Sequence, residues 1–157
     1  MRVNKKESAE ILLRNVTLAD VPILCRHAFP NQSSEQVEAW VAEWNTRQFQ
    51  GRYFEMFAVL ADGEIVGTIS LYQHADDVIS IGPEIFLPYR RRGYGTAAMQ
   101  YACEIAKDKG YRIVSQQIRT GNTASIAMHG ALGFETDGKT VINSKGNQVM
   151  IYRKNLI

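Results

Sequence analysis

The stretch "PYRRRGYGTAAM", Pro88 to Met99, decides how the chain is interpreted. It places three arginines, Arg90 to Arg92, directly before Gly93 and Gly95, between an apolar run and a segment of helical periodicity. The first N–H groups of a helix lack an intrahelical acceptor and carry partial positive charge, which stabilises an anion. Glycines let main-chain amides approach a ligand, and arginines favour phosphate. The stretch therefore predicts a diphosphate site at a strand-to-helix corner.

This loop matches neither of two common nucleotide-binding patterns. It lacks G-x-x-x-x-G-K-[ST], and Ala98 stands where G-x-G-x-x-G requires its last glycine. From the loop alone, a solvated basic turn that reverses the chain remains an alternative to a phosphate site.

Length and composition fit one globular domain covering residues 1–157, with 45% hydrophobic and 22% charged residues. A formal charge of +2 is too small for a general nucleic-acid or membrane surface, so we expect neither partner. Cys25 and Cys103 are far apart and predict reduced core thiols. The N-terminal stretch has no apolar run long enough for a signal peptide, and we expect a cytoplasmic protein.

The order of predicted elements is β-α-α-β-β-β-α-β-α-β-β, which indicates a mixed sheet with helices packed on it. Asp62-Gly63 predicts a hairpin turn, and Gly82-Pro83 predicts a bulge or a sheet edge. Strands are expected at Glu10–Val16, on both sides of that turn, in "DVISIGPEIFL", in "YRIVSQQI", in "FETDGKTVI" and in "QVMIYRKNL". Helices are expected after Thr17, after Ser33 with Gln36 as its capping partner, from Tyr94 to Lys109, and from Asn122 to Leu132.

The pattern Arg90-x-x-Gly93-x-Gly95, after "EIFLPY" and before a helix, resembles the acetyl-CoA pyrophosphate loop of the GNAT superfamily of N-acetyltransferases. A second segment, "NTASIAMHGALGF" from Asn122 to Phe134, resembles a later segment of that family, separated from the first by one helix and one strand. The resemblance covers nearly the whole chain. It implies an α/β fold with a mixed, mostly antiparallel sheet of about six to seven strands, a splayed parallel pair, and about four flanking helices.

The resemblance also implies how acetyl-CoA binds. Main-chain amides near the glycines would hold the diphosphate, and the pantetheine arm would pair with the edge of the preceding strand. Asn122 would either bond CoA or only cap its helix. The residues implied in cofactor binding are Ile85, Phe86, Leu87, Arg91, Arg92, Gly93, Tyr94, Gly95, Thr96 and Asn122. The side chains of the first three also fit plain core positions.

Two residues are candidates for the chemistry. Glu84 lies amid apolar neighbours, a setting that raises a carboxylate's affinity for a proton, and is the candidate base. His129 stands where many family members carry a tyrosine that donates to the CoA sulfur, and it is the candidate donor. The alternatives are a structural carboxylate and a packing histidine. The chain shows no set of residues with metal-ligand spacing, so we expect no metal.

The function that follows is transfer of an acetyl group from acetyl-CoA to a primary amine, directly within a ternary complex, with a small-molecule amine as the favoured acceptor. The alternatives are a protein N-terminal or lysine acetyltransferase and a non-catalytic CoA-binding module. Such folds often form homodimers, which makes a second copy of the chain a candidate partner. Residues expected to wall the acceptor side, several of which also fit a core, are Phe29, Trp40, Trp44, Phe49, Tyr53, Glu55, Tyr72, Asp76 and Asp77.

Overall fold

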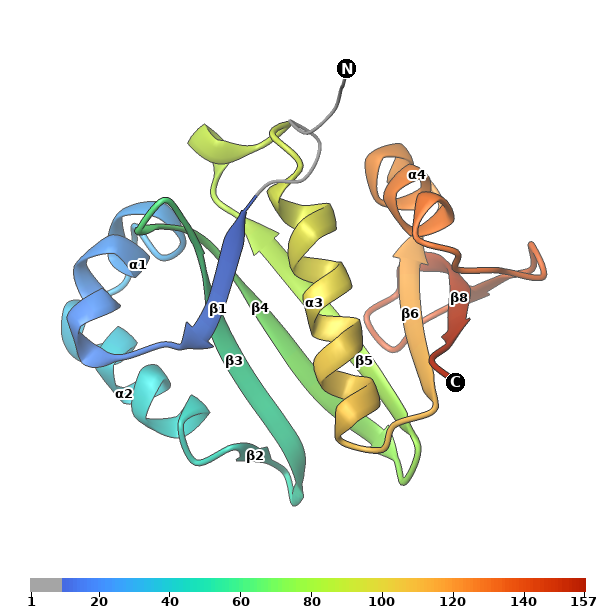
Figure 1. Cartoon of the computed structure of the whole chain (residues 1–157), viewed down its shortest axis with the longest axis horizontal. Coiled ribbons are helices and arrows are strands. Elements are labelled where there is room, and N and C mark those ends of the chain that lie inside the picture. The colour runs from blue at the N-terminus through green and yellow to red at the C-terminus, as the bar shows by residue number, and fades with distance from the viewer. Residues whose placement is uncertain (1–9) are drawn as a thin grey trace.

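A computed structural model of the chain describes residues 10–157, which form a twisted mixed sheet with helices on both faces (Figure 1). The sheet order is β1-β3-β4-β5-β6-β8-β7, with β2 paired to β3. The strands are β1 (Ile11–Asn15), β2 (Gln48–Phe49), β3 (Arg52–Ala61), β4 (Glu64–Ala75), β5 (Val78–Ile85), β6 (Ile113–Arg119), β7 (Thr140–Ile142) and β8 (Gln148–Asn155). The α-helices are α1 (Val21–His27), α2 (Ser34–Trp44), α3 (Tyr94–Asp108) and α4 (Thr123–Ala131).

The pair β5 and β6 is parallel, and the other strand pairs within residues 10–157 are antiparallel, as the resemblance implied. Only two residue pairs join the parallel strands, Val78 with Ile113 and Ile79 with Val114. Beyond Ile79 the strands diverge, and Figure 1 shows the gap widening toward the start of α3 and α4. The expected splayed pair is therefore present.

Local turn chemistry explains several element boundaries. Asp62 and Gly63 both have left-handed φ angles, of 51° and 82°, which match the twist of the β3–β4 hairpin. The Ser33 hydroxyl accepts the N–H of Gln36 at 3.1 Å and so caps α2. The predicted hairpin turn and the predicted Ser33 cap of α2 are confirmed.

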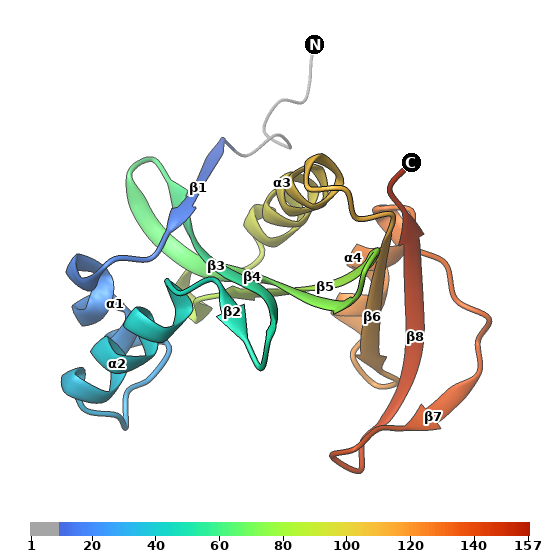
Figure 2. The same ribbon diagram turned by 90° about the horizontal axis from the view of Figure 1, so that it is seen from below.

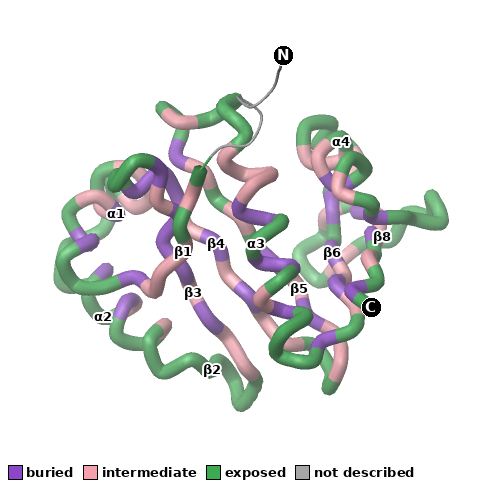
Figure 3. The backbone as a smooth tube through the Cα atoms, in the orientation of Figure 1, coloured by how far each residue is buried: buried purple, intermediate pink, exposed green. Residues whose placement is uncertain are grey.

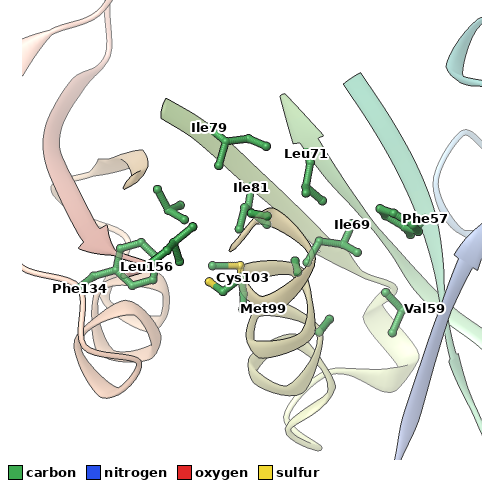
Figure 4. Close-up of a cluster of buried hydrophobic side chains, with 14 of the residues drawn as sticks. Phe57, Val59, Ile69, Leu71, Ile79, Ile81, Met99, Cys103, Phe134 and Leu156 are labelled. Atoms are coloured by element: carbon green, nitrogen blue, oxygen red, sulfur yellow. The ribbon is translucent and has the colours of Figure 1, made fainter. Parts of the chain in front are cut away.

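The two faces of the sheet have separate cores. Figure 2 shows α3 on one side of the central strands and α1 and α2 on the other. The apolar stripe of α3, including Met99 and Cys103, packs on Ile69 and Ile81 of the central strands (Figure 4). Helices α1 and α2 cover the opposite face, where Phe86 is buried with their valines and leucine. Figure 3 shows buried residues following the central strands and one side of α3, whereas the loop before α3 is exposed or half-buried.

Two expected elements differ in detail. Thr17 precedes a short 3-10 turn, Leu18–Asp20, and α1 begins only at Val21, which puts Pro22 in a first turn where its missing N–H costs nothing. The strand expected from Phe134 shrinks to β7, because side chains at 136 and 137 bond the main chain two residues on and favour turns. At Gly82-Pro83 the predicted sheet edge is confirmed, because both residues pair with β4 but lie beyond the residues of β5 that pair with β6.

None of the helices in residues 10–157 is long and apolar enough to span a membrane.

Candidate active site

The glycine corner forms a left-handed turn into α3. Arg91 and Gly93 have φ angles of 67° and 82°, and Gly93 is the N-cap of the helix. The Ala97 N–H bonds the Gly93 carbonyl at 3.1 Å, so the N–H groups of the first turn before Ala97 lie ahead of the intrahelical ladder. A left-handed residue next to a helix start turns successive amides toward one concavity, which suits an anion.

A cleft of about 580 Å³ lies against this corner, between the start of α3, the end of β5 and the start of α4. A Cβ built on Gly95 would stand 3.5 Å from Ile85 and 3.9 Å from Met128, so a side chain there would project into the cleft. The cleft is lined by Pro83, Glu84, Ile85, Tyr89, Arg90, Arg91, Gly93, Tyr94, Gly95, Thr96, Asn122, Ala124, Ser125 and Met128. The unpaired main-chain N–H groups, the arginines and the lack of a side chain at Gly95 together suit the diphosphate of a CoA molecule.

The three arginines have different positions. Arg90 is held back against the strand, because its Nε donates to the Ile85 carbonyl at 2.7 Å and its Nη2 to Glu84 at 3.1 Å. Arg91 lines the cleft, whereas Arg92 lies over the Tyr89 ring at 5.8 Å. Glu84 is accordingly an exposed, ion-paired carboxylate with a side chain 60% exposed. The apolar surroundings that we expected for Glu84 were wrong, because Arg90 folds back beside it.

The three residues expected at the strand edge, Ile85, Phe86 and Leu87, have different surroundings at the end of β5. Ile85 lines the cleft, but the Phe86 side chain is 1% exposed in the opposite core, and its N–H donates to Val66 at 2.8 Å. Leu87 begins a 3-10 turn, Leu87–Tyr89, and is 74% exposed. The structure therefore brings Ile85, but neither the Phe86 nor the Leu87 side chain, into the cleft.

Asn122 both caps a helix and lines the cleft, since its Oδ1 accepts the Ser125 N–H at 3.1 Å at the start of α4. The two alternatives weighed for this residue are thus compatible.

His129 is on the inner side of α4 and is 3% exposed. Its Nδ1 lies 2.8 Å from the Ser125 carbonyl, which can only accept, so Nδ1 carries the proton. Its Nε2 lies 3.3 Å from Gln116 Nε2. Burial lowers the pKa of His129, although the hydrogen bond to the Ser125 main chain acts in the opposite direction. The structure holds His129 behind Gln116 and outside the lining of the cleft.

A second cleft, of about 480 Å³, is lined by Ile81, Gly82 and Gln116 on one side of the diverging strands. Its lining combines apolar side chains with polar ones that carry no formal charge at neutral pH, and His74 bonds the Ser80 hydroxyl at 2.9 Å. Burial, and less so Arg52, lowers the pKa of His74. The lining residues are Ser70, His74, Val78, Ser80, Ile81, Gly82, Ser115, Gln116, Gln117 and Ile151. Gly82 lines this cleft and its neighbour Pro83 lines the first, so adjacent residues of β5 contribute to the two linings.

The expected acceptor wall is only partly found near this second cleft. Tyr72 contacts the rings of Phe49 and His74, at centroid distances of 6.0 and 5.1 Å. Trp40 and Trp44 instead pack on the core under α1 and α2. Glu55 lies buried on the α3 side of the sheet, where Asn15 and Tyr53 donate to its carboxylate.

Sequence reasoning missed Gln116, Tyr89 and Met128. Gln116 is buried, and its carboxamide bonds the main chain of Ile81, which lies 35 residues away in the sequence. No pattern in the residues around Gln116 indicates this long-range bond. Tyr89 and Met128 stood inside the two motifs already singled out, so their proximity to the cleft could have been inferred from the motifs. No group of His, Cys, Asp or Glu within residues 10–157 is arranged to hold a metal ion.

Comparison with known proteins agrees with this geometry. The model of the acetyltransferase (GNAT) family matches residues 22–134, more than half of the chain. The L-methionine sulfoximine/L-methionine sulfone acetyltransferase of Pseudomonas aeruginosa is 30% identical over 107 residues, which cover 65% of this chain and 60% of that protein. The chain thus aligns with less than two thirds of that relative's length.

Two solved structures show the same fold at low sequence identity. One is an acetyl transferase of Salmonella typhimurium that modifies the N-terminal serine of ribosomal protein L7/L12, with a TM-score of 0.80, 18% identity, and coverage of 95% of this chain and 96% of that one. The other is yncA of the same organism, solved with acetyl-CoA, with a TM-score of 0.69, 15% identity and 95% coverage of both chains. From the family match together with the glycine corner and the splayed strands, we conclude that the chain belongs to the GNAT family of acetyltransferases.

Proposed function

We propose that the protein transfers the acetyl group of acetyl-CoA to the primary amine of a small polar molecule, by direct attack within a ternary complex. The observation that carries this proposal is the convergence of two features on one cleft. The amide-rich start of α3 suits a diphosphate, and the open edge of β5 beside it suits an extended, amide-bearing arm. Arg91 to Thr96, Ile85 and Asn122 would hold the cofactor.

Bound acetyl-CoA would supply a thioester whose carbonyl carbon is attacked by a neutral amine. A C–N bond forms as the C–S bond breaks, one proton leaves the amine nitrogen, and one proton reaches the departing thiolate. Amines of lysine-like basicity are mostly protonated near neutral pH, so a proton acceptor is needed. Cys25 and Cys103 pack in the two cores, away from the residues that line both clefts, which favours direct transfer over an acyl-enzyme.

Glu84 is our candidate for the proton acceptor. Its carboxylate lies on the same strand face as Gly82 and Ser80, because alternate residues of a strand share a face. Glu84 lines the first cleft, and Gly82 on the same strand face lines the second. In our proposal the carboxylate would therefore lie between an amine held in the second cleft and a thioester held in the first. Its high exposure favours proton transfer through a water molecule.

We propose that His129 acts on the leaving thiolate indirectly, by positioning the Gln116 side chain. With Nδ1–H committed to Ser125, the Nε2 atom is an acceptor in this arrangement. Direct donation to the sulfur would require a protonated ring and a displaced Gln116 side chain. The direct donor role therefore stays a prediction.

The second cleft supports a small, polar acceptor. Its hydroxyl, amide and imidazole groups offer hydrogen bonds, and none of the side chains that line it within residues 10–157 is a carboxylate or a guanidinium. A polyamine carries several positive charges, which this described lining has no carboxylate to attract. The relative from Pseudomonas aeruginosa acts on methionine sulfoximine and methionine sulfone, whose amino group accompanies compact polar groups. A modified amino acid of this kind is the acceptor class that we favour.

The test is an acetylation screen with acetyl-CoA, following release of CoA thiol and product mass. The acceptor panel holds L-methionine sulfone, L-methionine sulfoximine, spermidine, and peptides with N-terminal serine or alanine. We expect turnover with the amino-acid analogues and little with spermidine. Turnover confined to the peptides would make the protein an N-terminal acetyltransferase, and binding of acetyl-CoA without turnover on any amine would favour a non-catalytic module.

A further inference from the structure

Gln116 occupies the point where β5 and β6 separate. Its Oε1 accepts the Ile81 N–H at 2.8 Å, and its Nε2 donates to the Ile81 carbonyl at 2.7 Å. The side chain is buried, and it bonds Ile81 as a residue of a paired strand would. The carboxamide thus takes the place of main-chain pairing one step beyond the last parallel pair, Ile79 with Val114.

The orientation of the Gln116 carboxamide is fixed by a series of hydrogen bonds that runs through His129 to Ser125. The Ser125 carbonyl takes the proton of His129 Nδ1, which leaves Nε2 as an acceptor for the second N–H of Gln116. The His129 ring is itself held edge-on to Phe134, at a centroid distance of 4.8 Å. Every polar atom of the Gln116 carboxamide therefore has a hydrogen-bond partner, and the His129 ring behind it is packed against Phe134.

The edge of β5 has few main-chain groups left for a ligand. Ile81, Pro83 and Ile85 direct their main-chain groups toward the opening, since alternate residues share a direction. Both groups of Ile81 are taken by Gln116, proline has no N–H, and the Ile85 carbonyl accepts from Arg90. Within residues 10–157, no strand pairs with the Pro83 carbonyl or the Ile85 N–H on this side of β5.

We propose that Gln116 is a specificity-determining residue that closes the inner end of this opening and so restricts the enzyme to short acyl thioesters. Ile85 lies four residue steps, or about 13 Å of strand, from Ile81. An extended arm that enters from the glycine corner along this edge ends against the Gln116 carboxamide. A longer acyl chain would have to displace a buried group with its hydrogen bonds already made.

This inference rests on the proposed function only in that acetyl-CoA must bind in the first cleft. Isothermal titration calorimetry with acetyl-CoA, propionyl-CoA and butyryl-CoA tests it without knowledge of the acceptor. The proteins are wild type, Gln116→Ala, Gln116→Asn and, as a matched control, Gln148→Ala, which removes an exposed glutamine of β8 outside both clefts. Thermal unfolding checks that each variant folds.

We expect wild type and Gln148→Ala to prefer acetyl-CoA. In Gln116→Ala the ratio of butyryl-CoA to acetyl-CoA affinity should rise at least about tenfold, because butyryl is longer by two methylene groups and room for one such group is worth about tenfold or more. A smaller rise is expected in Gln116→Asn, which carries the test if the alanine variant does not fold. An unchanged ratio in a folded Gln116 variant that binds acetyl-CoA would overturn the inference alone. Failure of wild type to bind any of the thioesters would overturn the proposed function as well.

Discussion

Arg90 is bonded to the strand that precedes it, because its Nε donates to the carbonyl oxygen of Ile85 at 2.7 Å. The Arg90 guanidinium therefore helps to fix the end of β5 beside the cleft. The main-chain amides of the following turn, rather than this guanidinium, form the anion-binding surface in our account.

Replacing Arg90 should affect cofactor binding more than stability. Both Arg90 and Glu84 are largely exposed, so Arg90→Ala should lower the free energy of unfolding by less than about 1 kcal/mol. Loss of the bond to Ile85 should raise the KM for acetyl-CoA about fivefold. Steady-state kinetics and chemical denaturation measure the two effects, with the exposed arginine of α1, Arg26→Ala, as the control. An unchanged KM would show that the strand end needs no such support.

Gly93 should contribute to two properties that can be measured separately, the stability of the fold and the affinity for CoA. Its φ of 82° makes Gly93→Ala costly by about 1 kcal/mol, and the same strain should appear in Gly110→Ala, where φ is 97° at the far end of α3. Only Gly93→Ala should also weaken CoA binding, since only that turn faces the cleft. Calorimetry and thermal unfolding on both variants test this. Equal losses of CoA affinity would mean that helix stability, not the turn, governs binding.

Removing the carboxylate of Glu84 should slow the chemical step. In Glu84→Gln we expect kcat to fall about 100-fold, within the usual range for general-base catalysis, while acetyl-CoA affinity stays unchanged. Glu64→Gln, at the start of β4 and outside both clefts, is the matched control. If kcat of Glu84→Gln equals that of wild type at saturating amine, Glu84 is not the base.

The buried histidine should make stability depend on pH. Burial lowers the pKa of His129, so between its folded value and the unfolded value near 6.5 the unfolded chain binds more protons. The free energy of unfolding should therefore fall as pH drops below about 6.5, and His129→Gln should reduce that slope. His74 contributes in the same direction, so His74→Gln serves as the comparison. Identical slopes for wild type and His129→Gln between pH 7 and pH 5 would contradict this.

Much of the fold could be predicted because its determinants are local. Asp62-Gly63 set one hairpin, Ser33 capped α2, and Gly93 marked the turn into α3. Each acts through its own dihedral angles or through neighbours within four residues, which is the range that a sequence pattern reveals.

The parts that could not be predicted depend on distant partners. Glu84 stood among apolar residues in sequence, but the path of the loop folded Arg90 beside it. The Gln116 bond to Ile81 joins two strands that a helix separates, and nothing near either residue indicates it. The burial of Phe86 depends on which face of the sheet α1 and α2 cover.

The central claim, that the amides at the start of α3 bind the diphosphate of CoA, is tested most directly by NMR. In a titration of ¹⁵N-labelled protein with CoA, we predict that the amide resonances from Arg91 to Thr96 shift most, together with Ile85 at the strand edge. Binding that leaves those resonances in place while others move, or no binding at all, would contradict the account.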